Sequence, residues 1–98
     1  MQKTSTKNVT KIKIEMPHMY KGVMLNDDVT TFDFVIFVLV EIFLKSDKEA
    51  QALTMSAHKN GSVVVGVYTR DIARSRVDNV EVLKKNVGYP LSFKILPE

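Results

Sequence analysis

The sequence has no cysteine and no tryptophan, and only three prolines and four glycines among its 98 residues. Without cysteine there are no disulfides, no thiol catalysis and no thiolate metal sites, which suits a reducing compartment. No apolar run approaches the roughly 20 residues of a membrane span, because the longest, Phe34 to Leu44, is interrupted by Glu41. Residues 1–17 also lack the apolar core of a secretory signal. We therefore expect a cytoplasmic protein with no membrane partner.

The formal net charge of +3 does not predict a nucleic-acid-binding domain. Residues 1–17 carry four lysines and one acidic residue, whereas residues 18–98 carry ten basic and ten acidic residues. The excess charge lies on a polar N-terminal segment, while nucleic-acid-binding domains usually carry a basic patch on the fold itself. Binding of nucleic acid through the lysines stays open as an alternative, and it would show a steep salt dependence.

The predicted elements follow the order β-α-α-β-α-β. Strand-like apolar runs lie at residues 19–25, 63–68 and 91–96. Apolar residues with helical spacing lie at about 32–44, 46–60 and 69–87. The valine-rich run at 63–68 is typical of a buried central strand. We expect an α+β domain over residues 18–98, a three-stranded antiparallel sheet with three helices packed on one face, and a flexible N-terminal extension over residues 1–17.

Capping residues mark the ends of the predicted helices. Thr30, with Asp33 three residues later, predicts the N-cap of the first helix, and Ser46 with Glu49 predicts a capping box for the second. Thr69 predicts the N-cap of the third. The predicted helix stops are Gly61 and Gly88.

Few residues offer catalytic chemistry. No nucleophile elbow, glycine-rich phosphate loop or zinc-binding helix motif is present. Asp27 and Asp28 fit a solvated turn, and His58 fits the end of a helix, where an imidazole complements the helix dipole. These three residues could hold a metal ion only with a special geometry. We therefore expect a protein that is not an enzyme and that uses no metal or cofactor.

One family signature is present over most of the chain. Met19-Tyr20-Lys21, followed by Leu25-Asn26-Asp27-Asp28 and Thr30, closely resembles the MYKV-x-L-x-NDD-x-T signature of the ClpS adaptor family. The resemblance covers about residues 17–96 and continues at Glu49-Ala50, His58, Gly61, Gly66-Val67-Tyr68-Thr69 and Pro90-Leu91. It implies the β-α-α-β-α-β fold predicted above. It also implies an adaptor that binds substrate proteins by an N-terminal Leu, Phe, Tyr or Trp, the N-degron, and delivers them to a Clp ATPase–protease.

The resemblance implies two groups of binding residues. Those that hold the substrate α-amine are Asn26, Asp27 and His58. Those that form the pocket wall are Thr30, Phe32, Val35, Thr54, Ala57 and Leu91. An ammonium group needs acceptors, and an amide oxygen, a carboxylate and a neutral imidazole are acceptors.

The resemblance also implies a second surface, on which Asp71 and Arg76 face the N-terminal domain of a ClpA- or ClpC-type ATPase. From the residues alone these two side chains read as a solvated helix face. The N-terminal extension is expected to engage the ATPase during delivery, and the protein is expected to be a monomer.

Some residues depart from the family pattern. Phe32 stands where a methionine usually gates the pocket, and Thr54 stands where another methionine lines it. We expect a rigid Phe32 ring to crowd substrates branched at Cβ, and Thr54 to make the pocket floor more polar. The alternative class is a structural or ribosome-associated interaction domain of similar topology, with no pocket for an N-terminus.

Overall fold

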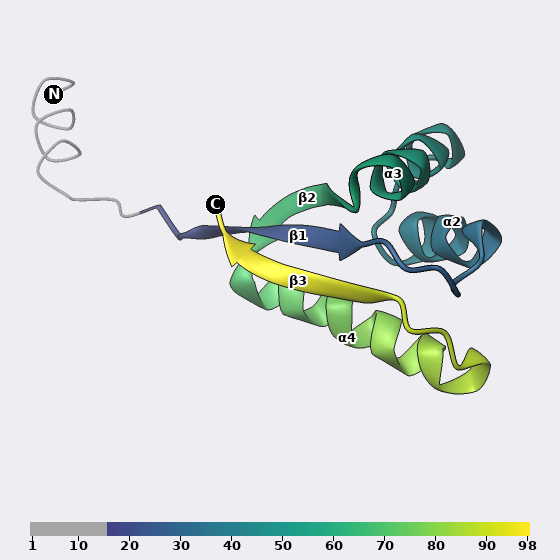
Figure 1. The fold of residues 1–98 in the computed structure, drawn as a ribbon. Helices are drawn as coiled ribbons and strands as arrows, with labels where there is room; N and C mark the ends of the chain where they lie inside the picture. The colour runs from purple at the N-terminus through teal and green to yellow at the C-terminus, as the bar shows by residue number, and fades with distance from the viewer. Residues whose placement is uncertain (1–15) are drawn as a thin grey trace, which may run out of the picture.

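The computed structural model describes residues 16–98, so the predicted extension over residues 1–17 falls outside the described residues except for Met16 and Pro17. The elements are β1 (Met19–Leu25), α2 (Phe32–Glu41), α3 (Asp47–Asn60), β2 (Ser62–Thr69), α4 (Arg70–Val87) and β3 (Ser92–Pro97). This is the predicted β-α-α-β-α-β order, shown in Figure 1. None of the described helices combines the length and apolar character that crossing a bilayer requires.

β1 is the central strand of the sheet. It pairs antiparallel with β2 on one side and with β3 on the other, in the order β2-β1-β3. The prediction that residues 63–68 form the central strand is wrong, because β2 lies at the edge and Val64 and Val67 are exposed. A run of valines fits a half-exposed edge strand as well as a buried one, so the run alone does not give a strand's place in the sheet.

A β-bulge interrupts the pairing of β1 with β2. The register shifts between Gly22 and Val23, and Val65 has no Cα partner across the ladder. Val65 is 2% exposed, so the bulge turns this extra residue into the core. Gly66 follows it and lies under the Tyr68 ring, where a Cβ would collide with the phenol.

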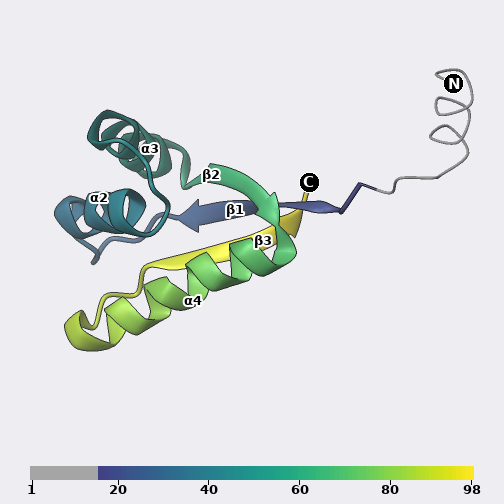
Figure 2. The ribbon, with the colours of Figure 1, turned by 180° about the vertical axis from the view of Figure 1, so that it is seen from behind.

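The helices lie in two places. α4 runs along the sheet and contacts all three strands, whereas α2 and α3 lie side by side beyond the end of β1 at Leu25 (Figures 1 and 2). The predicted packing of the sheet against three helices is confirmed, because α3 also contacts β2, and Phe43, just after α2, contacts the rings of Tyr68 and Phe93. Side chains from both places share one core, made of Met24, Val35, Val38, Leu39, Ile42, Phe43, Ala50, Ala57, Val65, Val80 and Leu91.

The helix ends follow the predicted caps in part. Ser46 and Glu49 form the capping box, and the left-handed Gly61 and Gly88 end α3 and α4. The cap predicted at Thr30 is wrong, because Thr31 accepts the Phe34 amide hydrogen and Thr30 bonds to a carboxylate instead. Thr69 is the N-cap of α4, but its side chain makes no capping hydrogen bond.

The first helix ends earlier than predicted, at Glu41 instead of Leu44. Leu44 has a φ of +58°, the left-handed conformation that a side chain disfavours. The Lys45 amide donates to the Leu39 carbonyl oxygen at 3.0 Å beyond this reversal. Leu44 therefore turns the chain from α2 toward α3 at a cost in conformational energy.

Replacing Leu44 by glycine should stabilise the protein, because Leu44 is 69% exposed and its side chain contributes little packing. The left-handed conformation costs about 1–2 kcal/mol, and glycine loses about 0.5–1 kcal/mol in extra entropy. We expect Leu44→Gly to raise the free energy of unfolding by about 0.5 kcal/mol. Leu44→Ala, which keeps the Cβ, should bring no gain. Urea denaturation measures both, and a less stable glycine variant would contradict a strained Leu44.

Candidate functional site

A small cavity opens where β1, α2, α3 and the start of β3 meet. It is lined by Met24, Leu25, Asn26, Asp27, Thr30, Phe32, Val35, Thr54, Ala57 and Leu91. Every residue predicted to bind substrate lines this cavity except His58. The free volume between these side chains is about 10 Å³, roughly the space of one water molecule. The fold thus gathers residues that are far apart in sequence around one small cavity.

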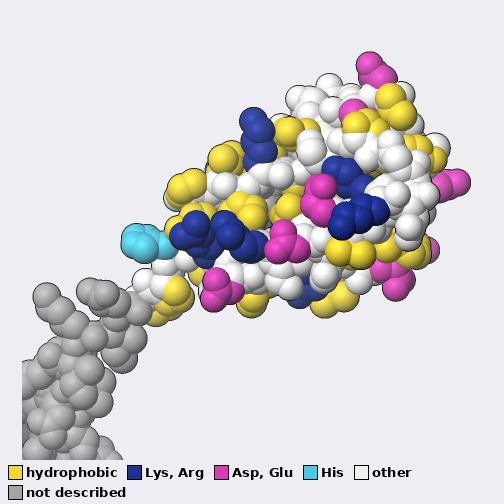
Figure 3. Space-filling view, turned by 90° about the horizontal axis from the view of Figure 1, so that it is seen from below, with side chains coloured by type: hydrophobic (Ala, Val, Ile, Leu, Met, Phe, Trp, Pro, Cys, Tyr) yellow, Lys and Arg dark blue, Asp and Glu magenta, His cyan; other side chains and the backbone are white. Residues whose placement is uncertain are grey.

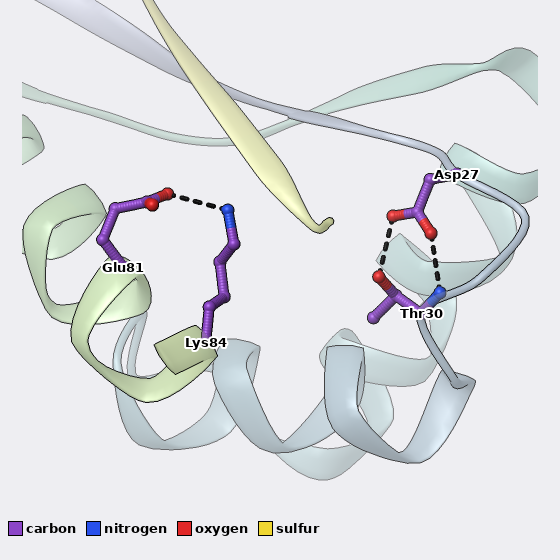
Figure 4. A network of polar contacts seen from close by, with 4 residues as sticks. All are labelled: Asp27, Thr30, Glu81 and Lys84. Atoms are coloured by element: carbon purple, nitrogen blue, oxygen red, sulfur yellow. Dashed lines mark hydrogen bonds and ion pairs between the residues drawn. The ribbon is translucent and has the colours of Figure 1, made fainter. Parts of the chain in front are cut away.

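Asp27 organises the turn between β1 and α2. Its Oδ1 accepts the amide hydrogens of Val29 at 2.9 Å and of Thr30 at 2.6 Å. Its Oδ2 accepts the Thr30 hydroxyl hydrogen at 2.8 Å, as Figure 4 shows. An aspartate that bonds to amides two and three residues later is typical of a tight turn. Here the bonds bring Asp27 and Thr30 together at the cavity.

These bonds also set the charge of Asp27. Burial alone raises the pKa of this carboxyl, but the hydrogen bonds from Thr30 and Val29, together with the positive charge of Lys84, outweigh it. The pKa of Asp27 therefore lies below its ordinary value of 3.8, and the group is ionised at neutral pH. Lys84 itself forms an ion pair with Glu81 at 3.0 Å (Figure 4).

Asp27 keeps an acceptor position for a ligand. A carboxylate oxygen has about two acceptor positions. Oδ1 uses both on backbone amides, whereas Oδ2 accepts one hydrogen bond from the described part of the chain. Asp27 is ionised and lines the cavity, so the position left on Oδ2 suits a cationic donor such as an ammonium group.

Asn26 lines the cavity beside Asp27, and His58 contacts the lining residue Phe32. The Asn26 amide donates to the Gly61 carbonyl oxygen at 2.9 Å, which ties the end of β1 to the end of α3. His58 lies one turn before Gly61 and is exposed. Its ring packs against the Phe32 ring in a T-shaped arrangement, with ring centroids 5.2 Å apart and an angle of 75° between the ring planes. His58 is thus placed beside the cavity by contact with Phe32, a lining residue.

The cavity wall is apolar and well packed. Val35, Thr54, Ala57 and Leu91 are each less than 9% exposed, whereas Phe32 is 43% exposed. The Thr54 hydroxyl donates to the Ala50 carbonyl oxygen at 2.7 Å. That bond uses its hydrogen, so Thr54 brings no free donor to the floor, and the predicted polarity of the floor is limited to its oxygen.

Sequence reasoning missed two lining residues, Met24 and Leu25. They end β1 immediately before Asn26, so their closeness in sequence to the predicted amine-binding residues was the available signal. Met24 is 1% exposed and also belongs to the core. The floor of the cavity is therefore continuous with the hydrophobic core.

Asp71 and Arg76 lie away from this cavity, on α4. Asp71 is exposed in the first turn of the helix. Arg76 is half-buried and donates from Nη1 to the Ile42 carbonyl oxygen at 2.5 Å, just after α2. Arg76 therefore has a structural role, since it joins α4 to the end of α2. Figure 3 shows that the face seen from below carries basic, acidic and hydrophobic side chains side by side.

The site has the chemistry of binding. It offers an ionised acceptor beside an apolar wall, which suits a ligand with a cationic end and an apolar side chain. Within residues 16–98 no three His, Cys, Asp or Glu side chains are placed to hold a metal ion, so Asp27, Asp28 and His58 form no such group. The fold and the cavity together define a small binding domain.

Comparison with known proteins identifies the family. The family model of the "ATP-dependent Clp protease adaptor protein ClpS" matches residues 15–94. The ATP-dependent Clp protease adapter protein ClpS of Campylobacter jejuni (strain RM1221) is 42% identical over 98 residues, with 100% of both chains covered. That of Acetivibrio thermocellus is 41% identical over 97 residues, covering 99% of this chain and 98% of the relative. The chain belongs to the ClpS family, the adaptors of the ATP-dependent Clp protease.

A solved structure agrees with the fold. The structure of Agrobacterium tumefaciens ClpS2 bound to L-phenylalaninamide is similar to this chain with a TM-score of 0.80 and 41% identity. The match covers 85% of this chain and 100% of that one. Membership of an adaptor family leaves the alternative of a structural or ribosome-associated domain without support.

Asp27→Asn should weaken the fold in a pH-dependent way. The folded pKa of Asp27 lies below 3.8, so the stabilisation is complete above that value and is lost as the pH falls through the folded pKa. We expect a loss of about 1 kcal/mol at neutral pH, and no more because the side chain is partly exposed. The difference between the two proteins should shrink in acid below pH 3.8.

Urea denaturation at neutral and acidic pH makes this comparison. The matched control is Asp28→Asn, since Asp28 is an exposed neighbour that accepts none of the hydrogen bonds of this turn. A loss for Asp27→Asn that is the same at every pH would mean that the charge of the carboxylate is unimportant.

Proposed function

We propose that this protein is a non-enzymatic adaptor that binds the N-terminal residue of substrate proteins and delivers them to a Clp ATPase–protease. The observation that carries the proposal is the cavity, which Asp27 lines together with apolar side chains while its Oδ2 accepts only one hydrogen bond from the described residues. The ligand of the Agrobacterium tumefaciens relative, L-phenylalaninamide, has the same two parts, an α-amine and a large apolar side chain. The preferred first residues are Leu, Phe, Tyr and Trp.

In the proposed complex the α-ammonium donates to three acceptors. These are Oδ2 of Asp27, the side-chain oxygen of Asn26 and a ring nitrogen of His58. The side chain of the first residue enters the cavity between Val35, Ala57 and the other wall residues, Thr30, Phe32, Thr54 and Leu91. The amine and the side chain are thus recognised together, which selects an N-terminus over an internal residue.

The expected affinity is moderate. Burial of a Leu or Phe side chain contributes about 1.5–3 kcal/mol. Each charge-assisted hydrogen bond contributes about 1.5–3 kcal/mol. After the cost of association, a few such contributions give roughly micromolar binding. Binding of this strength suits an adaptor that releases its cargo to an enzyme.

The proposal includes a partner surface on α4. Asp71 is exposed and can pair with a basic side chain of an ATPase. Arg76 keeps further donors beyond the one bonded to Ile42. We propose that this surface binds the N-terminal domain of a ClpA- or ClpC-type ATPase. We also propose that residues 1–17 help to transfer the substrate from the adaptor to the ATPase. The adaptor acts as a monomer in the cytoplasm, a reducing compartment that suits a chain without cysteine.

Acetylation of the substrate amine should abolish binding. It removes the positive charge and two donors, and it leaves the Asp27 acceptor desolvated and unpaired. We expect a peptide that begins with Leu to bind and its N-acetylated twin to lose at least about a hundredfold in affinity. Isothermal titration with the two peptides makes the measurement. Equal affinities would end the proposal that the site reads an N-terminus.

His58→Ala should weaken binding of the Leu peptide, because the ammonium group loses one of its three proposed acceptors. We expect a loss of at least about tenfold in affinity, the contribution of one charge-assisted hydrogen bond. His18→Ala, at a histidine outside the cavity, is the control and should bind as the wild type does. Equal affinities of His58→Ala and the wild type in isothermal titration would remove His58 from the binding site.

A further inference from the structure

A second hollow lies directly beside the first. It is an open groove between α2 and α3, lined by Phe32, Asp33, Ile36, Gln51, Thr54 and Met55. Its free volume is about 370 Å³, against about 10 Å³ in the cavity. Phe32 and Thr54 line both hollows, so these two side chains form the wall between them. The two spaces are neighbours separated by one ring and one buried threonine.

The cavity cannot accept a large side chain as it stands. Its free volume holds about one water molecule, so a Leu or Phe side chain requires part of the wall to move. Val35, Ala57 and Leu91 are packed in the core at 7%, 3% and 1% exposure. Phe32 is 43% exposed. It is therefore the apolar wall residue with the greatest freedom to move.

The position of Phe32 in its helix favours such a movement. It is the first residue of α2, so no preceding helical turn restricts its χ1 rotamers. In the present position its ring contacts His58 and lines the cavity. Because Phe32 also lines the groove, a change of χ1 need move the ring only a short way to leave the cavity for the groove.

The groove offers the ring an apolar surface. Ile36 lies one turn after Phe32 on the same helix and is partly buried against the core. Met55 faces the groove from α3 and is 47% exposed, and methionine adapts readily to aromatic neighbours. A ring between these two side chains stays largely out of water. The displaced ring therefore keeps apolar contacts that it would lose in solvent.

From these observations we infer that the α2–α3 groove receives the Phe32 ring when substrate enters the cavity, so that Ile36, Gln51 and Met55 help to determine affinity and specificity without touching the substrate. The inference rests on the proposed function and deepens it. In the closed position the Phe32 ring contacts His58, as described above, and in the open position it lies in the groove. Only protein with the ring in the open position binds substrate. Apparent affinity then falls in proportion to the fraction of molecules that are open, and the groove sets that fraction.

The test fills the groove. Gln51→Trp places an indole in the groove, and Ala52→Trp places the same indole at the next position of α3, which is exposed and lines neither hollow. Binding of L-phenylalaninamide and of a Leu-initiated peptide is measured for both variants, each made in the wild-type chain and in Phe32→Ala. A thermal melt confirms that every variant is folded.

We expect Gln51→Trp to weaken binding at least about tenfold in the wild-type chain, because the open position is filled. It should have no further effect in Phe32→Ala, and Ala52→Trp should have none in the wild-type chain. Equal weakening with and without Phe32 would overturn the inference, since the groove would then act on the substrate directly. The inference would also be overturned if Gln51→Trp left binding in the wild-type chain unchanged.

A crystal structure of the wild-type complex with L-phenylalaninamide gives a second readout. The ring of Phe32 should lie between Ile36 and Met55, and a ring still in contact with His58 would contradict the inference. Failure of the wild-type protein to bind any free N-terminus would instead count against the proposed function. The two failures are therefore distinguishable.

Discussion

The hydrogen bonds between Asp27 and Thr30 are the interaction on which the site depends. They close the turn that leads from the central strand into α2, so they determine where Phe32 and Val35 stand relative to the end of β1. The same bonds keep the carboxylate ionised. One side chain thereby joins the geometry of the fold to the chemistry of recognition.

The second constraint is space. The cavity is continuous with the core through Met24 and Leu91, and a packed core does not open by small amounts at many places. Entry of a side chain must therefore be met by one mobile element at the edge. Phe32 fits this description because it is the most exposed apolar residue of the lining and the first residue of its helix. In the mechanism that we infer, binding and ring displacement are a single equilibrium.

Local signals in the sequence predicted much of this structure. β1 was predicted with its observed limits, and the capping box at Ser46 and the glycine stops are local patterns that the structure confirms. The central place of β1 was not predictable in the same way, because it depends on pairing between residues far apart in sequence. The early end of α2 at a left-handed Leu44 was missed because leucine does not signal a stop.

For the binding site, too, the sequence predicted the residues but not the contacts that depend on packing. The family signature named the residues that gather at the cavity, but it did not show that Asp27 is already held by three hydrogen bonds or that Arg76 bonds to the end of α2. The contact between Phe32 and His58 and the small volume of the cavity are products of packing. Periodicity and spacing carry no information about them.

The most direct test of the account is degradation of two reporter proteins that differ only in the first residue, Leu or Gly. Each is incubated with a ClpA- or ClpC-type ATPase and its protease, with and without this protein. Because both reporters have a free amine, the comparison isolates the side chain that enters the cavity. The account predicts that this protein accelerates degradation of the Leu reporter and not of the Gly reporter. Equal acceleration of both, or of neither, would contradict it.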